Sequence, residues 1–172
     1  MINVTQTFLP PQDEYQTILK KAWDAVWLTN RGQLVKELEI KLQNYLSSAP
    51  LLATTNGTLP LQIALKVLAK QGEVITTPFS YVATTSSIVW ENSTPVFVDI
   101  DLDTLNLNLN QVEIAARDSG AKIIIFAHVL GNPPNMDRLM EIVNKYNLIL
   151  LEDCCDALGS TYDGKELGSF GD

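Results

Sequence analysis

The sequence is poor in cysteine, histidine and positive charge. Its 172 residues include two Cys and one His, and 12 Lys and Arg stand against 20 Asp and Glu, which gives a net charge of −8. A single His excludes a zinc site built from several imidazoles. The acidic balance argues against binding to nucleic acid or to an anionic membrane surface. No apolar run approaches the roughly 18 residues that a membrane-spanning helix needs.

Signals for export and for disulfide formation are missing as well. The segment Met1–Tyr15 has neither the basic start nor the apolar core of a signal peptide. Cys154 and Cys155 are adjacent, which is a poor arrangement for a structural disulfide, and they lack the C-x-x-C spacing of redox and zinc motifs. We therefore expect a cytoplasmic protein, with both cysteines present as reduced, buried thiols packed at a strand end.

What the chain does contain is enough apolar material for a folded core: 46% of its residues are hydrophobic and 19% are charged. From Gln12 to Leu46 the apolar spacing is helical, and the stretch Trp27–Gly32 interrupts it. This pattern predicts two helices joined by a loop. We assign residues 1–48 to an N-terminal helical segment and residues 49–172 to an α/β domain.

In the second part, short apolar runs alternate with amphipathic stretches, which is typical of βαβ units and a mostly parallel sheet covered by helices. The carboxyl ends of parallel strands meet at one edge, where such sheets bind ligands. The predicted strands are Leu51–Thr54, Val74–Thr77, Pro95–Val98, Lys122–Ala127 and Leu148–Leu151, and the predicted helices lie near Leu59–Ala69, Tyr81–Trp90, Gln111–Arg117 and Met136–Tyr146.

Three groups of residues after these strands could act on a ligand. Gly57 and Thr58 open a helix and could bind a phosphate, although Asn56 and Thr58 also suit an ordinary helix cap. Asp153 could coordinate Mg²⁺, act as a base, pair with a protonated ring nitrogen or simply face solvent. Tyr81 could stack on a planar ligand or belong to the core.

Other motifs are absent or incomplete. The acidic stretch Asp99–Asp103 lacks the Gly and distant Glu of a calcium loop, so it reads as a polar loop, and we predict no metal site. There is no G-x-G-x-x-G, Walker A or G-x-S-x-G motif. Their absence argues against a dinucleotide-binding protein, an ATP-binding protein and a serine hydrolase.

Taken in order, these segments resemble one family. The chain is similar to the large domain of the DegT/DnrJ/EryC1/StrS nucleotide-sugar aminotransferases, which depend on pyridoxal 5′-phosphate (PLP) and have the aspartate-aminotransferase-like fold (PLP fold type I). The resemblance extends over nearly the whole sequence. It is carried by Trp27–Thr29, Thr55–Thr58, Gly72–Ile75, Phe79–Thr84, Pro95–Asp101, Glu152-Asp153, Gly164-Lys165 and Gly171-Asp172.

The resemblance implies a role for each candidate residue. Gly57 and Thr58 would hold the cofactor phosphate, Tyr81 would stack on the pyridine ring, and Asp153, the predicted catalytic residue, would pair with the pyridinium nitrogen. Asp156 falls where the family usually has a Gln or His that faces the ring hydroxyl. The resemblance also implies a homodimer, a nucleotide-linked keto-sugar substrate and an amino-acid donor, in deoxysugar or cell-surface polysaccharide synthesis.

Two departures keep alternatives open. Asp156 and the segment Ala127–Asn132 look more like the sugar 3-dehydrase branch, which uses pyridoxamine 5′-phosphate (PMP). The family's Schiff-base lysine, replaced by His in that branch, lies downstream of a Gly-Asp pair, and none of Lys122, Lys145 or Lys165 matches it. We therefore expect an N-terminal portion of such an enzyme, lacking this lysine and inactive alone. The alternatives are a 3-dehydrase portion, a catalytically inactive fragment and a flavodoxin-like binding module.

Overall fold

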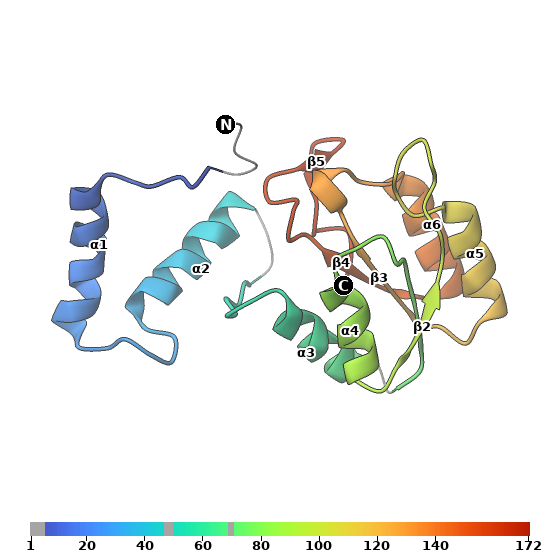
Figure 1. Ribbon diagram of the computed structural model, residues 1–172, viewed down its shortest axis with the longest axis horizontal. Helices are drawn as coiled ribbons and strands as arrows, with labels where there is room; N and C mark the ends of the chain where they lie inside the picture. Colours follow the sequence, from blue (N-terminus) through green and yellow to red (C-terminus); the bar gives the residue numbers. More distant parts are fainter. Residues whose placement is uncertain (1–5, 47–49, 69–70) are drawn as a thin grey trace. The chain divides into compact units, whose positions relative to one another are not determined.

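The computed structural model describes residues 6–46, 50–68 and 71–172. It divides into two compact units, Met1–Ala53 and Thr54–Asp172 (Figure 1). No helix in the described ranges is long and apolar enough to cross a membrane.

The first unit contains two helices, α1 (Gln12–Ala25) and α2 (Gln33–Tyr45), joined by a loop, as the sequence predicts. Glu39 is buried in this unit, and its carboxylate lies 2.7 Å from the Arg31 guanidinium and accepts a hydrogen bond from the Ala53 backbone N–H. The apolar stripe of α1 is less well covered, because the side chain of Ile18 is 53% exposed.

The second unit is built on a parallel four-stranded sheet with the order β2-β1-β3-β4. The strands are β1 (Glu73–Thr76), β2 (Thr94–Phe97), β3 (Ile123–Ala127) and β4 (Ile149–Asp153). Because all four run the same way, their carboxyl ends share one edge, which confirms the predicted arrangement.

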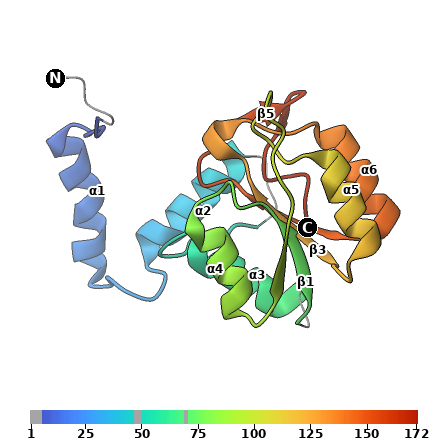
Figure 2. The ribbon, with the colours of Figure 1, turned by 45° about the vertical axis from the view of Figure 1, so that its right-hand side comes forward.

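Helices cover both faces of this sheet (Figures 1 and 2). α3 (Thr58–Leu68) and α4 (Val82–Trp90) pack on the face that presents Val74 and Ile125, and α5 (Leu109–Asp118) and α6 (Met136–Tyr146) pack on the face that presents Ile75 and Leu150. The alternation of buried side chains along each strand produces this three-layer α/β/α structure. A short 3-10 helix, η1 (Val129–Gly131), follows β3.

One predicted strand is wrong. Leu51–Thr54 has no regular structure, the side chain of Leu52 is 66% exposed, and the Ala53 N–H bonds to a side chain rather than to a neighbouring strand. A short apolar run does not by itself distinguish a strand from a connecting segment. The structure also contains a small hairpin that the sequence analysis missed, formed by β5 (Thr161–Tyr162) and β6 (Lys165–Glu166).

Candidate active site

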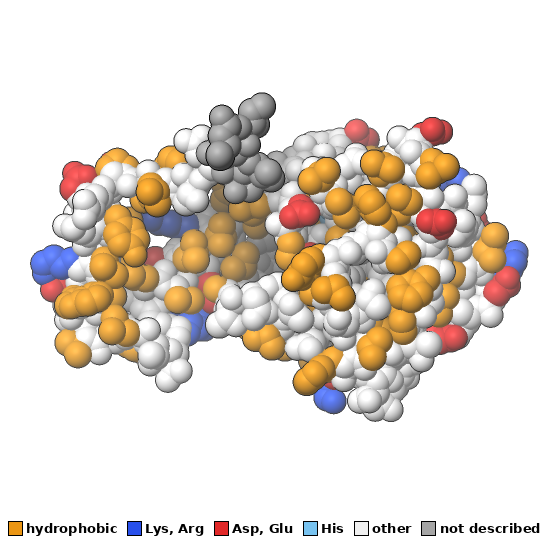
Figure 3. Space-filling view, in the orientation of Figure 1, with side chains coloured by type: hydrophobic (Ala, Val, Ile, Leu, Met, Phe, Trp, Pro, Cys, Tyr) orange, Lys and Arg blue, Asp and Glu red, His pale blue; other side chains and the backbone are white. Residues whose placement is uncertain are grey.

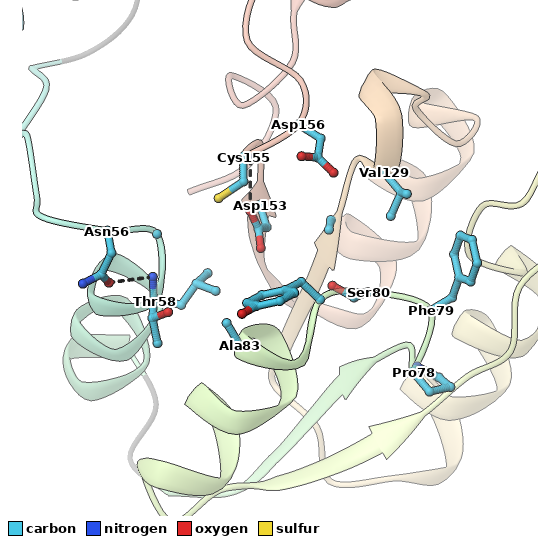
Figure 4. Close-up of a pocket in the computed structure, with 14 residues that line it drawn as sticks. Asn56, Thr58, Pro78, Phe79, Ser80, Ala83, Val129, Asp153, Cys155 and Asp156 are labelled. Carbon is cyan, nitrogen blue, oxygen red and sulfur yellow. Dashed lines mark hydrogen bonds between the residues drawn. The ribbon is translucent and has the colours of Figure 1, made fainter. Parts of the chain in front are cut away.

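A cavity of about 740 Å³ opens at the carboxyl edge of the parallel sheet, within the second unit (Figure 4). The first turn of α3, the segment between β1 and α4, and the residues after β3 and β4 form its walls. The five residues singled out by the sequence all lie in this lining. The complete lining is Asn56, Gly57, Thr58, Leu61, Pro78, Phe79, Ser80, Tyr81, Ala83, Ala127, Val129, Asp153, Cys155 and Asp156.

The amino end of α3 points hydrogen-bond donors at one spot beside the cavity. The Asn56 side-chain oxygen accepts hydrogen bonds from the backbone N–H groups of Thr58 and Leu59, both at 3.0 Å (Figure 4 shows the first). These groups are the unpaired donors at the start of a helix, and the helix dipole makes the same spot favourable for an anion. The cap and anion interpretations therefore concern the same two N–H groups.

Gly57 lies in close contact with the segment that follows β4. A Cβ atom added at this position would stand 2.7 Å from the sulfur of Cys155, well inside van der Waals contact. The absence of a side chain thus lets the α3 loop approach the strand end that carries Asp153. The choice of Gly here is explained by packing against Cys155.

Asp153 is the last residue of β4, and both of its oxygens accept hydrogen bonds. Oδ1 accepts from the Cys155 backbone N–H at 3.2 Å, and Oδ2 accepts from the Thr84 hydroxyl at 3.3 Å. Thr84 is buried within α4, and its hydroxyl lies 2.8 Å from that of Ser80. Asp153 is thus held from two directions while its carboxylate lines the cavity.

Asp156 and Tyr81 complete the set of predicted residues. Asp156 is exposed and lies on the same side of the cavity as Asp153 (Figure 4), so two carboxylates line the site. Tyr81 directly precedes α4, and its side chain is 79% exposed, which shows that its ring is not part of the core. Within the described part of the chain, no Lys, Arg or His lines the cavity, so the positive potential here comes from backbone N–H groups.

The two thiols differ from the sequence expectation of a buried pair, because Cys155 is exposed and lines the cavity. A hydrogen bond to Asp153 and partial burial raise the pKa of Cys155 to about 11. Burial, together with the charges of Glu152 and Asp153, raises the pKa of Cys154 to about 12. Both groups are therefore protonated, weakly nucleophilic thiols near neutral pH.

Glu152, the neighbour of Asp153, makes its contacts elsewhere. Its carboxylate accepts a hydrogen bond from His128 Nε2 at 2.9 Å and backbone hydrogen bonds from Gly168, Phe170 and Gly171 at 3.0, 2.8 and 2.7 Å. Burial alone would raise the pKa of Glu152, but these donors outweigh it and hold the pKa below its usual range. The Cys154 sulfur, a His128 ring nitrogen and a Glu152 oxygen lie within 4.8 Å of one another, which is close enough for three ligands of one metal ion. The Glu152 oxygens, however, already accept hydrogen bonds from the four donors named above.

Sequence reasoning missed Ser80 and Thr84, and it separated Asp153 from Glu152 only through the family resemblance. Alternation along β4 could have predicted that separation, since adjacent residues of a strand point to opposite faces. The contact between Thr84 and Asp153 joins residues 69 positions apart, so no local sequence pattern predicts it.

Comparison with known proteins identifies the family. Residues 11–172 match the model of the DegT/DnrJ/EryC1/StrS aminotransferase family. The chain is 37% identical over 163 residues to dTDP-4-amino-4,6-dideoxy-D-glucose transaminase of Escherichia coli, covering 95% of this chain and 44% of that protein. It is 40% identical over 131 residues to dTDP-4-dehydro-2,6-dideoxy-D-glucose 3-dehydratase of Saccharopolyspora spinosa, covering 76% of this chain and 28% of that protein.

Solved structures agree. DesI, determined in the presence of its TDP-sugar product, superposes with a TM-score of 0.86 at 34% identity, over 94% of this chain and 41% of that chain. The Streptococcus pneumoniae protein Spr1654 in its PLP form gives a TM-score of 0.87 at 27% identity, over 99% and 47%. The chain thus spans less than half the length of these four relatives. Its α/β unit has the aspartate-aminotransferase-like fold, and the chain belongs to the DegT/DnrJ/EryC1/StrS aminotransferase family.

Proposed function

We propose that the cavity binds PLP or PMP, and that the whole protein transfers an amino group from an amino acid to a keto-sugar carried on a nucleotide. The observation that carries this proposal is the convergence of Gly57, Thr58, Tyr81, Asp153 and Asp156 on one cavity. Family membership supports it, since relatives include sugar transaminases and structures in PLP and PMP forms.

The residues present fit the phosphate end of such a cofactor. The Asn56 oxygen occupies the point on which two N–H groups of α3 converge, which is where a phosphate oxygen would accept the same bonds. Asn56 is exposed, so its side chain can turn away without leaving a buried polar group unsatisfied. The Thr58 hydroxyl and the Gly57 N–H would complete the cradle.

The residues also fit the ring. Asp153 would accept a hydrogen bond from the protonated ring nitrogen, Tyr81 would cover the ring, and Asp156 would face its hydroxyl. When bound, the cofactor supplies a cationic ring that withdraws electrons from the carbon bearing the amino nitrogen. The part of Asp153 is to keep the ring nitrogen protonated by holding a negative charge beside it. None of Lys122, Lys145 and Lys165 lines the cavity, so we assign none of them as a covalent anchor.

A 3-dehydratase role is the second candidate. It is favoured by the 40% identity to the Saccharopolyspora spinosa enzyme and by Asp156, which departs from the transaminase pattern. The deciding observation is the residue of the complete protein that aligns with the Schiff-base lysine of the family. Lys at that position excludes the dehydratase, and His excludes the transaminase.

The setting of the enzyme is also part of the proposal: a cytoplasmic homodimer that takes part in deoxysugar or cell-surface polysaccharide synthesis. Exposed hydrophobic side chains support association (Figure 3 shows such side chains across one face). They include Tyr15 and Ile18 on α1, Val67 on α3 and Trp90 on α4.

The test is a fluorescence titration of the 172-residue chain with PMP, which needs no covalent anchor. We expect saturable binding, and binding of pyridoxamine, which lacks the phosphate, weaker by more than about tenfold. Asp153→Ala should weaken PMP binding as well. An acidic binding module of the flavodoxin kind, or a fragment unable to hold the cofactor, would leave PMP unbound, and the former would bind Mg²⁺ instead.

A further inference from the structure

The Thr84 hydroxyl connects α4 to the strand end that carries Asp153. It lies 3.3 Å from Asp153 Oδ2 and 2.8 Å from the Ser80 hydroxyl, and the Thr84 side chain is buried. We propose that Thr84, itself oriented by Ser80, is a positioning residue that holds the Asp153 carboxylate for the cofactor ring nitrogen. This inference rests on the proposed binding of PLP or PMP.

The direction of the hydrogen bonds follows from a count of protons. An ionised carboxylate only accepts, so the single hydroxyl proton of Thr84 is donated to Asp153. Ser80 must then donate its own proton to Thr84. The result is a chain of donors that runs from Ser80 in the cavity wall, through the buried Thr84, to the negative charge of Asp153.

The two bonds to Asp153 come from different parts of the fold. Thr84 holds Oδ2 from α4, and the Cys155 N–H holds Oδ1 from the segment after β4. The Cys155 thiol also hydrogen-bonds to this carboxylate, and the four lone-pair positions of a carboxylate leave one free for a further donor. Restraint of both oxygens limits rotation of the carboxylate, so it meets the ring nitrogen in one orientation without first losing conformational freedom.

A purely structural role for Thr84 makes a different prediction. If its hydroxyl served only to satisfy a buried polar group, its removal would loosen α4 and affect all ligands of the cavity alike. If it positions Asp153, the loss should appear only with ligands that have a ring nitrogen to meet that carboxylate.

The experiment compares Thr84→Val, which keeps the shape and removes the hydroxyl, with Thr84→Ser, which restores it. Each 172-residue variant is titrated with PMP and with a 1-deaza analogue of PMP, in which a carbon replaces the ring nitrogen. Thr84→Val should weaken PMP binding by about threefold to tenfold and change binding of the analogue by less than about twofold. Thr84→Ser should bind PMP as the unaltered chain does. Thr85→Val, a matched change at the next and partly exposed residue of α4, is the control.

A thermodynamic cycle adds a second readout. In an Asp153→Ala background, Thr84→Val should no longer alter PMP affinity, because the group it positions is gone. If Thr84→Val does not fold, Ser80→Ala serves instead and should weaken PMP more than the deaza analogue.

Three results would overturn the inference: equal losses for both ligands, no loss for PMP, or an undiminished effect of Thr84→Val in the Asp153→Ala background. If the unaltered chain binds neither ligand, the proposed function fails, and this inference fails with it. If the unaltered chain binds PMP and the variants show no selective loss, only the positioning role is wrong.

Discussion

His128 Nε2 lies 2.9 Å from Glu152 Oε2, and the side chains of the two residues are 0% and 2% exposed. The same carboxylate accepts three backbone hydrogen bonds from Gly168, Phe170 and Gly171, which hold residues 168–171 against the end of β4. Glu152 thus organises the chain on one side of the strand end, while Asp153 lines the cavity on the other.

Replacement of Glu152 by Gln should therefore destabilise the fold. The amide nitrogen of Gln cannot accept the hydrogen bonds that one Glu152 oxygen accepts, and buried donors would lose their partner. We expect the free energy of unfolding to fall by about 3 kcal/mol, measured by urea denaturation. Hydrogen exchange should speed up at Gly168, Phe170 and Gly171. The control Glu141→Gln, on the exposed side of α6, should change stability by less than about 0.5 kcal/mol.

The same carboxylate predicts an acid dependence of stability. Its pKa is lower in the folded chain than in the unfolded one, so the stabilisation it supplies is complete above the unfolded value of about 4.3. That contribution is lost as the pH falls through the lower, folded pKa. Urea denaturation between pH 3 and pH 7, a range chosen about the unfolded value, should show a loss of stability in acid that is smaller in Glu152→Gln. An equal loss in both proteins would show that other groups cause it.

Gly57→Ala should damage the cavity through its contact with Cys155. The added methyl would stand 2.7 Å from the sulfur, so the α3 loop must move away from the β4 end. We expect PMP binding to weaken by more than about tenfold. The double variant Gly57→Ala/Cys155→Ala removes the obstructing sulfur and should recover most of the affinity. Failure of that recovery would mean that Gly57 is needed for a reason other than its contact with Cys155.

Asn56→Ala should have opposite effects on stability and on affinity. Loss of this cap should cost the free chain about 1 kcal/mol of stability, but it frees the Thr58 and Leu59 N–H groups for a phosphate. PMP should therefore bind about fivefold more tightly, and the stabilities of the two proteins should converge at saturating PMP. Asn108→Ala removes the equivalent cap of α5, away from the cavity, and should lower stability without changing PMP affinity. Unchanged or weaker PMP binding by Asn56→Ala would contradict the shared use of these N–H groups.

The sequence predicts those parts of the fold that depend on local pattern. β3 is an almost wholly apolar run buried on both faces, and its strand was predicted to within one residue. Leu51–Thr54 is also a short apolar run, but it pairs with no strand and is partly exposed, because composition does not reveal whether a neighbouring strand is available. The hairpin around Asp163 and Gly164 was missed, although an Asp-Gly pair with both residues at positive φ is a common hairpin turn.

In the candidate site, too, the sequence predicts the residues that depend on local pattern and not those that depend on tertiary contacts. Gly57, Thr58 and Asp153 could be found because each ends a strand or begins a helix at one edge of a parallel sheet, and Asp156 was found through the family resemblance. The residues that hold these side chains in place could not be found in the same way. Thr84 contacts Asp153, and residues 168–171 contact Glu152, only once the chain is folded. Tertiary hydrogen bonds of this kind leave no periodic trace in the sequence.

The most direct test of the central claim is a map of PMP binding by amide NMR on the 172-residue chain. If PMP binds in the cavity at the sheet edge, the largest shifts on titration will fall on residues 57–59, 80–84 and 153–156, with little change at residues 110–118 of α5. Saturable binding whose shifts lie elsewhere, or no saturable shift at all in the folded chain, would contradict it.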